Sequence, residues 1–283
     1  MQNRRHFMAG TLGMLLAGVG SRLWAAESDK ATPAVVPEAP KVDHQSNHNL
    51  SMMPADWTKP DQIAMLIYPE FTALDLIGPH YMFAGLMGAT VHIVAATREP
   101  VTSDTKVTIV PTATYDEVPQ DLTVLFIPGG GESVIRALED EKLMAFVRDR
   151  GSRAKYVTST CTGSLILAGA GLLQGYKATS HWVAREALVA GGATPVNERV
   201  VRDRNRITGA GVTAGIDLGL SLIAELRDTF YAQNMQLLAE YAPQPPFNAG
   251  TPETAPKEAV QLMSKMFTGY NDKAQAAIKK ALG

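Results

Sequence analysis

Short apolar runs alternate with longer amphipathic stretches along most of the chain, starting at residue 62. Residues 62–68 (QIAMLIY) form a continuous apolar run that Pro69 ends, which is typical of a strand buried on both faces of a sheet. Further strands are predicted at 90–96, 122–127 and 155–160. Helices are predicted at 75–87 (with Gly78-Pro79 in its first turn), 134–150, 162–173, 182–190 and 214–241, the last with a break near Asp228. This alternation predicts an α/β fold with a mostly parallel sheet covered on both faces.

A second amphipathic pattern follows the turn Pro243-Gln244-Pro245-Pro246. Residues 257–282 carry apolar side chains at spacings that suit one or two helices packed on the domain or on a partner subunit. These side chains are Val260, Met263, Met266, Phe267, Ala274 and Ile278. We therefore predict one α/β domain over residues 61–245 and a C-terminal helical extension over 246–283.

The first 26 residues have the pattern of an export signal. Arg4-Arg5 precedes an apolar stretch of 13 residues (8–20), and small residues follow at Ala25-Ala26. The stretch is shorter than the ~20 residues that span a bilayer. The paired arginines before Phe7 resemble a twin-arginine signal, although an ordinary secretory signal has similar features. We expect a periplasmic protein that has no membrane association after cleavage.

Residues 27–60 are predicted to form a disordered linker. Five prolines lie among polar residues without an apolar period, so the segment buries too little surface to offset its ordering entropy. His44 and His48 could bind a metal weakly, but solvated linker residues are the preferred interpretation. We expect no metal site.

Composition and cysteine content exclude several classes of partner and site. The 283 residues are 46% hydrophobic and 19% charged, with a net charge of -2, and the chain contains one cysteine. This balance indicates neither nucleic acid nor an anionic membrane surface as a partner. A single cysteine excludes an intrachain disulfide and a cysteine-rich zinc site. Cys161 is therefore either a buried small hydrophobic residue or a reactive group.

The local sequence favours the reactive interpretation. Cys161 stands between a β-prone run (156–160) and a helix rich in small residues, the pattern of a nucleophile elbow. The N–H groups at the start of that helix are expected to lower the pKa of the thiol and favour thiolate. Gly163 would let the helix approach the strand closely.

Three further features are candidates for the same site. Gly129, Gly130 and Gly131 end the neighbouring strand and could form an oxyanion-type pocket, or only a flexible turn. Asp75, at the start of the first helix, could cap that helix or exchange protons with the thiol. His181 is either structural or close enough to reach the site.

The segments around these residues resemble the DJ-1/PfpI superfamily and, within it, the isonitrile hydratase subgroup. The resemblance runs from about residue 62 to beyond 248. The matching segments are 74–79 (LDLIGP), the Pro-Gly-Gly turn, the cysteine elbow, 168–175 (AGAGLLQG), 178–182 (ATSHW), 198–203 (ERVVRD), 213–217 (TAGID), 240–243 (EYAP) and 246–250 (PFNAG).

This resemblance implies a flavodoxin-like three-layer sandwich that is usually dimeric and needs no cofactor. It also implies that Cys161, Thr162 and Asp75 carry a reaction that adds water to an isonitrile to give an N-substituted formamide. Family peptidases have histidine directly after the cysteine, whereas this chain has Thr162, which weakens a protease or deglycase interpretation. The alternatives are a periplasmic small-molecule binding or sensing protein, and a redox or carbonyl-stress protein of the DJ-1 type.

Overall fold

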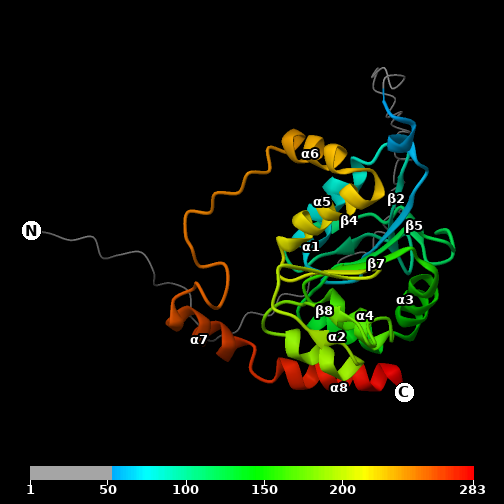
Figure 1. Cartoon of the computed structure of the whole chain (residues 1–283). Helices are drawn as coiled ribbons and strands as arrows, with labels where there is room; N and C mark the ends of the chain where they lie inside the picture. Colours follow the sequence, from blue (N-terminus) through cyan, green and yellow to red (C-terminus); the bar gives the residue numbers. More distant parts are fainter. Residues whose placement is uncertain (1–52) are drawn as a thin grey trace, which may run out of the picture. The chain divides into compact units, whose positions relative to one another are not determined.

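The computed structural model describes residues 53–283, which form one compact unit. The predicted signal peptide (1–26) and most of the predicted linker (27–60) lie outside the described residues. Figure 1 shows the arrangement of the elements that are described.

A seven-stranded sheet forms the centre of the domain. Six strands run parallel to one another, and only β10 runs antiparallel to them, paired with β11. In spatial order the strands are β10 (Val200–Asp203), β11 (Arg206–Gly209), β7 (Tyr156–Thr160), β6 (Val124–Ile127), β1 (Gln62–Leu66), β2 (Thr90–Ala95) and β5 (Ala113–Thr114). The four predicted strands are therefore confirmed, and the two edges of the sheet were not predicted.

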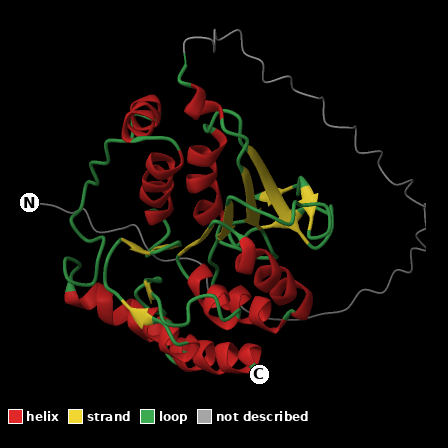
Figure 2. Cartoon of the chain, turned by 45° about the vertical axis from the view of Figure 1, so that its right-hand side comes forward, coloured by secondary structure: helices red, strands yellow, loops and turns green. Residues whose placement is uncertain are grey.

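Helices cover both faces of the sheet, as Figures 1 and 2 show. One face carries α1 (Ala73–Ala84), α5 (Ala214–Leu226) and α6 (Thr229–Leu238). The other carries α2 (Glu132–Glu139), α3 (Glu141–Arg153), α4 (Gly163–Gly169) and α8 (Tyr270–Leu282). This is the predicted flavodoxin-like three-layer sandwich.

Small elements complete the fold. Two short strand pairs stand apart from the main sheet, and a 3-10 helix, η3, takes the place of the helix predicted at 182–190. These elements are β3 (Val101–Thr102) with β4 (Thr108–Ile109), β8 (Lys177–Ala178) with β9 (Thr194–Pro195), and η3 (Arg185–Gly191). Within residues 53–283, no helix is long and apolar enough to cross a membrane.

Two aspartates set helix boundaries by capping. Asp140 accepts hydrogen bonds from the N–H groups of Lys142 and Leu143, and it divides the helix predicted at 134–150 into α2 and α3. Asp228 accepts from the N–H of Tyr231 and produces the predicted break between α5 and α6. An aspartate at this position satisfies N–H groups that have no partner within the helix.

The first helix differs from the sequence prediction. It begins at Ala73, two residues earlier than expected, so Pro79 lies in its interior and not in its first turn. The small residues Gly215 and Gly219 of α5 face Pro79 and Met82, which lets the two helices pack closely.

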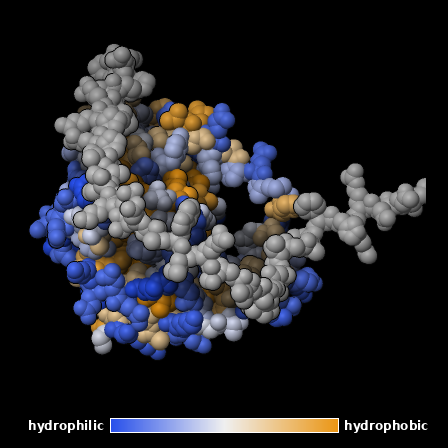
Figure 3. Space-filling model, turned by 180° about the vertical axis from the view of Figure 1, so that it is seen from behind, coloured by the Kyte–Doolittle hydropathy of each residue, from blue (hydrophilic) through white to orange (hydrophobic). Residues whose placement is uncertain are grey.

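The C-terminal extension consists of two helices that differ in burial. α8 buries Tyr270, Ala274, Ala277 and Ile278 against the domain, whereas α7 (Lys257–Met266) buries no residue. In the reverse view of Figure 3, hydrophilic side chains dominate the described part of the face and are interrupted by separate apolar patches.

The last residues of the predicted linker pack on the domain. Trp57, in the 3-10 helix η2 (Ala55–Thr58), is buried against Tyr231, and its Nε1 donates to Asp228 at 2.7 Å. The buried guanidinium of Arg227 binds the carbonyls of Trp57 and Lys59. Burial of the indole offsets the ordering cost that the polar composition suggested, so the ordered domain begins before residue 61.

The strand order indicates where a ligand would bind, at the carboxyl ends of β1 and β6. The chain passes from β1 to β2 on one side and later returns to β6 on the other side of β1. In open parallel sheets, ligands bind at the carboxyl ends of the strands where the order reverses in this way.

Candidate active site

Cys161 occupies a strained turn at the carboxyl end of β7. Its φ is 56°, in the left-handed region, which costs a non-glycine residue free energy. Its N–H donates to the Gly209 carbonyl at 3.0 Å, and its own carbonyl accepts from the hydroxyls of Ser164 (3.1 Å) and Ser180 (3.0 Å). The predicted nucleophile elbow is present, and neighbouring segments hold its backbone on both sides.

The helix after Cys161 approaches β6 very closely. A Cβ on Gly163 would lie 2.3 Å from the Ile127 carbonyl oxygen, so only glycine fits at this position. This contact brings the start of α4 against the turn that follows β6.

That turn, residues 128–131, binds the other predicted site residues. The Gly129 N–H donates to Asp75 Oδ2 at 2.9 Å, and the Gly130 N–H donates to Thr162 Oγ1 at 3.0 Å. Thr162 Oγ1 also donates to the Gly130 carbonyl at 2.6 Å. Of the three glycines expected to form an oxyanion pocket, Gly129 and Gly130 thus have their N–H groups engaged by Asp75 and Thr162 in this structure.

Asp75 does not cap its helix. It is the third residue of α1 and fully buried, while the N–H of Ala73 is bound by the carboxylate of Asp104. Asp75 Oδ1 has no hydrogen-bond partner among the described residues. An unpaired, buried carboxyl oxygen is costly for folding and is a feature expected of a functional group.

The environment of Asp75 shifts its pKa strongly. Burial raises the pKa of Asp75 to about 7, and the negative charge of Asp104 adds to this. The Gly129 N–H and the Cys161 thiol act in the opposite direction, because they stabilise the ionised carboxylate. A carboxyl group with a pKa near neutrality is suited to both accepting and donating protons.

The pKa of the Cys161 thiol is raised, whereas the sequence predicted a lowered one. Burial raises the pKa of Cys161 well above its ordinary value, and the negative charge of Asp75 raises it further. The Thr162 N–H lowers it, as expected at a helix start, but this is a smaller effect. The resting cysteine is therefore a neutral thiol beside a carboxylate that can take its proton, and the two groups titrate as a pair.

His181 lies near the site without a described contact to Cys161. The contact is made by the adjacent Ser180, through the Cys161 carbonyl. His181 borders a pocket of about 400 Å³ that Gly211, Arg185 and Thr251 also line, and burial lowers the pKa of its imidazole. His181 thus belongs to the surroundings of the site and not to the group around Asp75.

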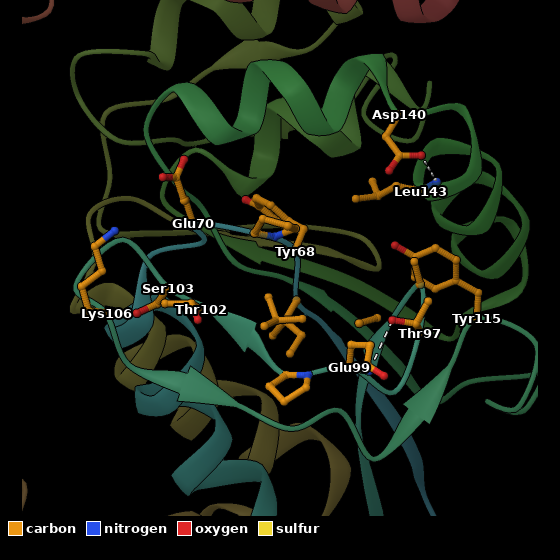
Figure 4. Close-up of a pocket in the computed structure, with 16 residues that line it drawn as sticks. Tyr68, Glu70, Thr97, Glu99, Thr102, Ser103, Lys106, Tyr115, Asp140 and Leu143 are labelled. Atoms are coloured by element: carbon orange, nitrogen blue, oxygen red, sulfur yellow. Dashed lines mark hydrogen bonds between the residues drawn. The ribbon is translucent and has the colours of Figure 1, made fainter. Parts of the chain in front are cut away.

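A cavity of about 530 Å³ opens at the carboxyl ends of β1 and β2 (Figure 4). Its wall includes Tyr68, Thr97, Tyr115 and Leu143, and Cys161 is not part of its lining. Tyr68 connects the cavity with the site, because the charges of Asp75 and Cys161 both contribute to the raised pKa of its hydroxyl, after the larger effect of burial.

Sequence reasoning missed three residues around Asp75 and Cys161. They are Tyr68, whose hydroxyl donates to the Pro128 carbonyl at 2.9 Å, Asp104, and Tyr270 of α8, whose hydroxyl donates to the Gly131 carbonyl at 3.0 Å. Tyr68 lies two residues after the end of β1, and that position is a usable signal. Nothing in the local sequence of Asp104 or Tyr270 indicates a role.

No group of three or more His, Cys, Asp or Glu side chains in residues 53–283 is arranged to hold a metal ion. The site consists of a thiol, a carboxyl, a hydroxyl and a glycine turn.

These features define a flavodoxin-like α/β protein whose site is a cysteine on a strand-to-helix turn. Residues 61–225 match the DJ-1/PfpI family, and the chain belongs to this family. It is 48% identical over 199 residues to isonitrile hydratase of Pseudomonas putida, which covers 70% of this chain and 86% of that protein.

Solved structures agree with this assignment. A THiJ/PfpI family protein from Pseudomonas syringae is 55% identical and superposes with a TM-score of 0.79, covering 82% of this chain and 99% of that one. DJ-1 of Schizosaccharomyces pombe, at 19% identity and a TM-score of 0.56, covers 64% of this chain and 100% of that one and shares the fold.

Proposed function

We propose that this protein is a cysteine-dependent hydratase that adds water to an isonitrile and gives an N-substituted formamide. One observation carries the proposal: the buried Asp75 carboxyl, with a pKa of about 7 and one oxygen that has no partner within residues 53–283, lies beside the Cys161 thiol. The identity to isonitrile hydratase of Pseudomonas putida supports the choice of substrate.

The reaction begins with proton transfer inside the pair. Asp75 takes the thiol proton as Cys161 Sγ attacks the terminal carbon of R–NC, and Asp75 then delivers this proton to the same carbon. The product is a thioimidate, R–N=CH–S–Cys161. Since the resting thiol is neutral, attack and deprotonation are coupled, and Asp75 provides the proton acceptor that a buried thiol requires.

Water completes the cycle. Asp75 removes one proton from an attacking water and returns it to the nitrogen, which gives R–NH–CH(OH)–S–Cys161. The hydroxyl then loses its proton to Asp75, the C–S bond breaks, and the sulfur regains the proton. The formamide R–NH–CHO leaves, and both groups return to their initial states.

Thr162 has a supporting part in this sequence. Its N–H lowers the pKa of Cys161 and so stabilises the sulfur when it carries charge, while its hydroxyl holds the Gly130 carbonyl. The N–H acts on the leaving thiolate as well as on the attacking one.

The test is turnover of a simple alkyl isonitrile by the purified protein, with formamide detected by NMR and Cys161→Ala as the control. Formamide from the wild type alone, together with a mass increase that matches the thioimidate under rapid quenching, is the expected result. Absence of turnover by the wild type would overturn the proposal. Ligand-dependent thermal stabilisation that persists in Cys161→Ala would then favour a binding protein.

We further propose that the protein acts as a homodimer in the periplasm. The twin-arginine-like start of the sequence supports export, and the family supports a dimer. The exposed apolar side chains Phe230, Leu237 and Leu238 of α6 are candidates for a subunit contact. Fractionation of cells and sedimentation of the purified protein test the two statements separately.

A further inference from the structure

The turn at residues 128–131 has an unusual degree of external support. All four of its carbonyl groups accept a hydrogen bond from another segment. The donors are the Tyr68 hydroxyl to Pro128 (2.9 Å), the Thr72 N–H to Gly129 (2.8 Å), the Thr162 hydroxyl to Gly130 (2.6 Å) and the Tyr270 hydroxyl to Gly131 (3.0 Å). Each peptide plane carries the carbonyl of one residue and the N–H of the next. The bonds to the Pro128 and Gly129 carbonyls therefore fix the N–H directions of Gly129 and Gly130, and the bond to the Gly131 carbonyl fixes the junction between the turn and α2.

Those N–H directions matter for the site. The Gly129 N–H holds Asp75 Oδ2, and the Gly130 N–H holds Thr162 Oγ1. A small rotation of the turn would release the carboxyl and the hydroxyl together. Tyr68 and Tyr270, two of the donors that fix the turn, therefore influence Asp75 and Thr162 through the backbone of the turn.

Tyr270 is the donor that comes from farthest along the chain. It is the first residue of α8, after Gly269 at a φ of 78°, and its side chain is buried. Its ring packs edge-on against Phe267, and the neighbouring Asn271 donates to the Val183 carbonyl at 2.7 Å. The start of α8 is thereby fixed on the segment that follows His181.

The hydroxyl of Tyr270 also lies within interaction range of the reacting groups. Burial raises the pKa of this hydroxyl most, and the charge of Cys161 raises it further. This hydroxyl donates its one proton to the Gly131 carbonyl at 3.0 Å.

We propose that Tyr270 is a positioning residue of the active site. Through the Gly131 carbonyl it anchors the end of the 128–131 turn where α2 begins, and this limits movement of the adjoining Gly129 and Gly130 peptides that bind Asp75 and Thr162. The effect of Tyr270 on turnover rests on the proposed function, whereas its effect on the geometry of the turn does not. The C-terminal extension is accordingly part of the site.

The test compares Tyr270→Phe with Tyr156→Phe in the whole protein. Tyr156 makes a matched control because its hydroxyl also donates one hydrogen bond, to Glu225 at 2.9 Å, but at the amino end of β7. For Tyr270→Phe we expect kcat for an isonitrile to fall about tenfold, with KM changed less than about threefold. We expect the acid limb of the pH profile to move to higher pH, because a loosened Gly129 N–H stabilises the Asp75 carboxylate less. Tyr156→Phe should stay within about twofold of the wild type.

Alkylation of Cys161 by iodoacetamide as a function of pH gives a readout that needs no isonitrile. The Thr162 N–H lowers the pKa of Cys161, so a displaced Thr162 should move the midpoint of alkylation to higher pH in Tyr270→Phe. Should the wild type lack hydratase activity, this measurement still decides the role of Tyr270. If Tyr270→Phe fails to fold, Asn271→Ala, which releases the start of α8, should show the same upward movement. A midpoint equal to that of Tyr156→Phe in the folded variant would overturn the proposal.

Discussion

Thr162 and Gly130 are joined by two reciprocal hydrogen bonds: Thr162 Oγ1 donates to the Gly130 carbonyl at 2.6 Å and accepts from the Gly130 N–H at 3.0 Å. The pair connects the residue after the nucleophile with the turn that holds Asp75. Replacing Thr162 by Val removes both bonds at nearly constant volume. We expect kcat to fall ~10- to 100-fold, since each buried hydrogen bond contributes about 1 kcal/mol. Thr162→Ser retains the hydroxyl and should keep most of the activity, and an equal loss in both variants would contradict a role for the hydroxyl.

The pH dependence of catalysis should follow Asp75. Because Asp75 must be ionised to accept the thiol proton, kcat/KM should rise with pH through the raised pKa of this carboxyl, about 7. Asp104→Asn removes a negative charge that raises the pKa of Asp75, so the rise should move to lower pH. Asparagine can still accept the Ala73 N–H and cap α1. Glu186→Gln, an exposed change on η3, is the control, and an unmoved profile in Asp104→Asn would contradict the coupling.

Asp75→Asn should separate activity from stability. The native state holds the Asp75 proton more tightly than the unfolded chain, because the pKa rises from 3.8 to about 7 on folding. The unfolded chain therefore releases this proton first, and the free energy of unfolding falls as pH rises from about 4 to about 7. The amide of Asp75→Asn has no such pH dependence.

We expect Asp75→Asn to be inactive, yet more stable than the wild type at pH 8 by at most about 4 kcal/mol, with the difference vanishing near pH 4. Urea titrations at the two pH values measure this, and a loss of stability at pH 8 would argue against the raised pKa.

Replacing Gly129 by alanine should have a much larger effect than replacing Gly131. A Cβ on Gly129 would lie 2.6 Å from Asp75 Oδ2 and 2.7 Å from the Thr162 nitrogen, whereas one on Gly131 would meet no atom within 4 Å. Gly129→Ala should abolish activity and cost about 2 kcal/mol or more, as overpacking typically does. Gly131→Ala should retain both activity and stability. Thermal unfolding and turnover of the two variants, measured side by side, test the close approach.

Cys161 should react slowly with oxidants and alkylating agents at neutral pH. Reactivity follows the thiolate fraction, and burial with the Asp75 charge raises the pKa of Cys161. Mass spectrometry after mild peroxide should find little sulfenic acid at pH 7. Rapid and selective oxidation would instead favour the redox function considered for DJ-1 relatives.

The sequence was sufficient for the elements that depend on local patterns. The four central strands, the elbow at Cys161 and the helix break at Asp228 all follow from apolar runs, small residues and capping chemistry. The strands β5, β10 and β11 were missed because each is only two to four residues long, which leaves little periodicity to detect.

The state of the thiol could not be predicted from local sequence. A helix start lowers the pKa of a cysteine, but burial and a carboxyl on another helix have the larger effect here, and both arise from tertiary packing. The same holds for Tyr270, which lies more than 100 residues beyond Cys161 in sequence and reaches the site only because α8 packs beside α2 and α4.

Arg227 fixes the segment that leads into β1 to the domain. Its guanidinium contacts the carbonyls of Trp57, Lys59 and Met87 and forms a buried ion pair with Asp61. These contacts lie at the amino ends of β1 and β2, while the catalytic groups lie at the carboxyl ends. A tag attached ahead of residue 53 would thus be joined to the domain at the end of the sheet opposite Cys161. Immobilisation of the protein through such a tag should leave turnover intact.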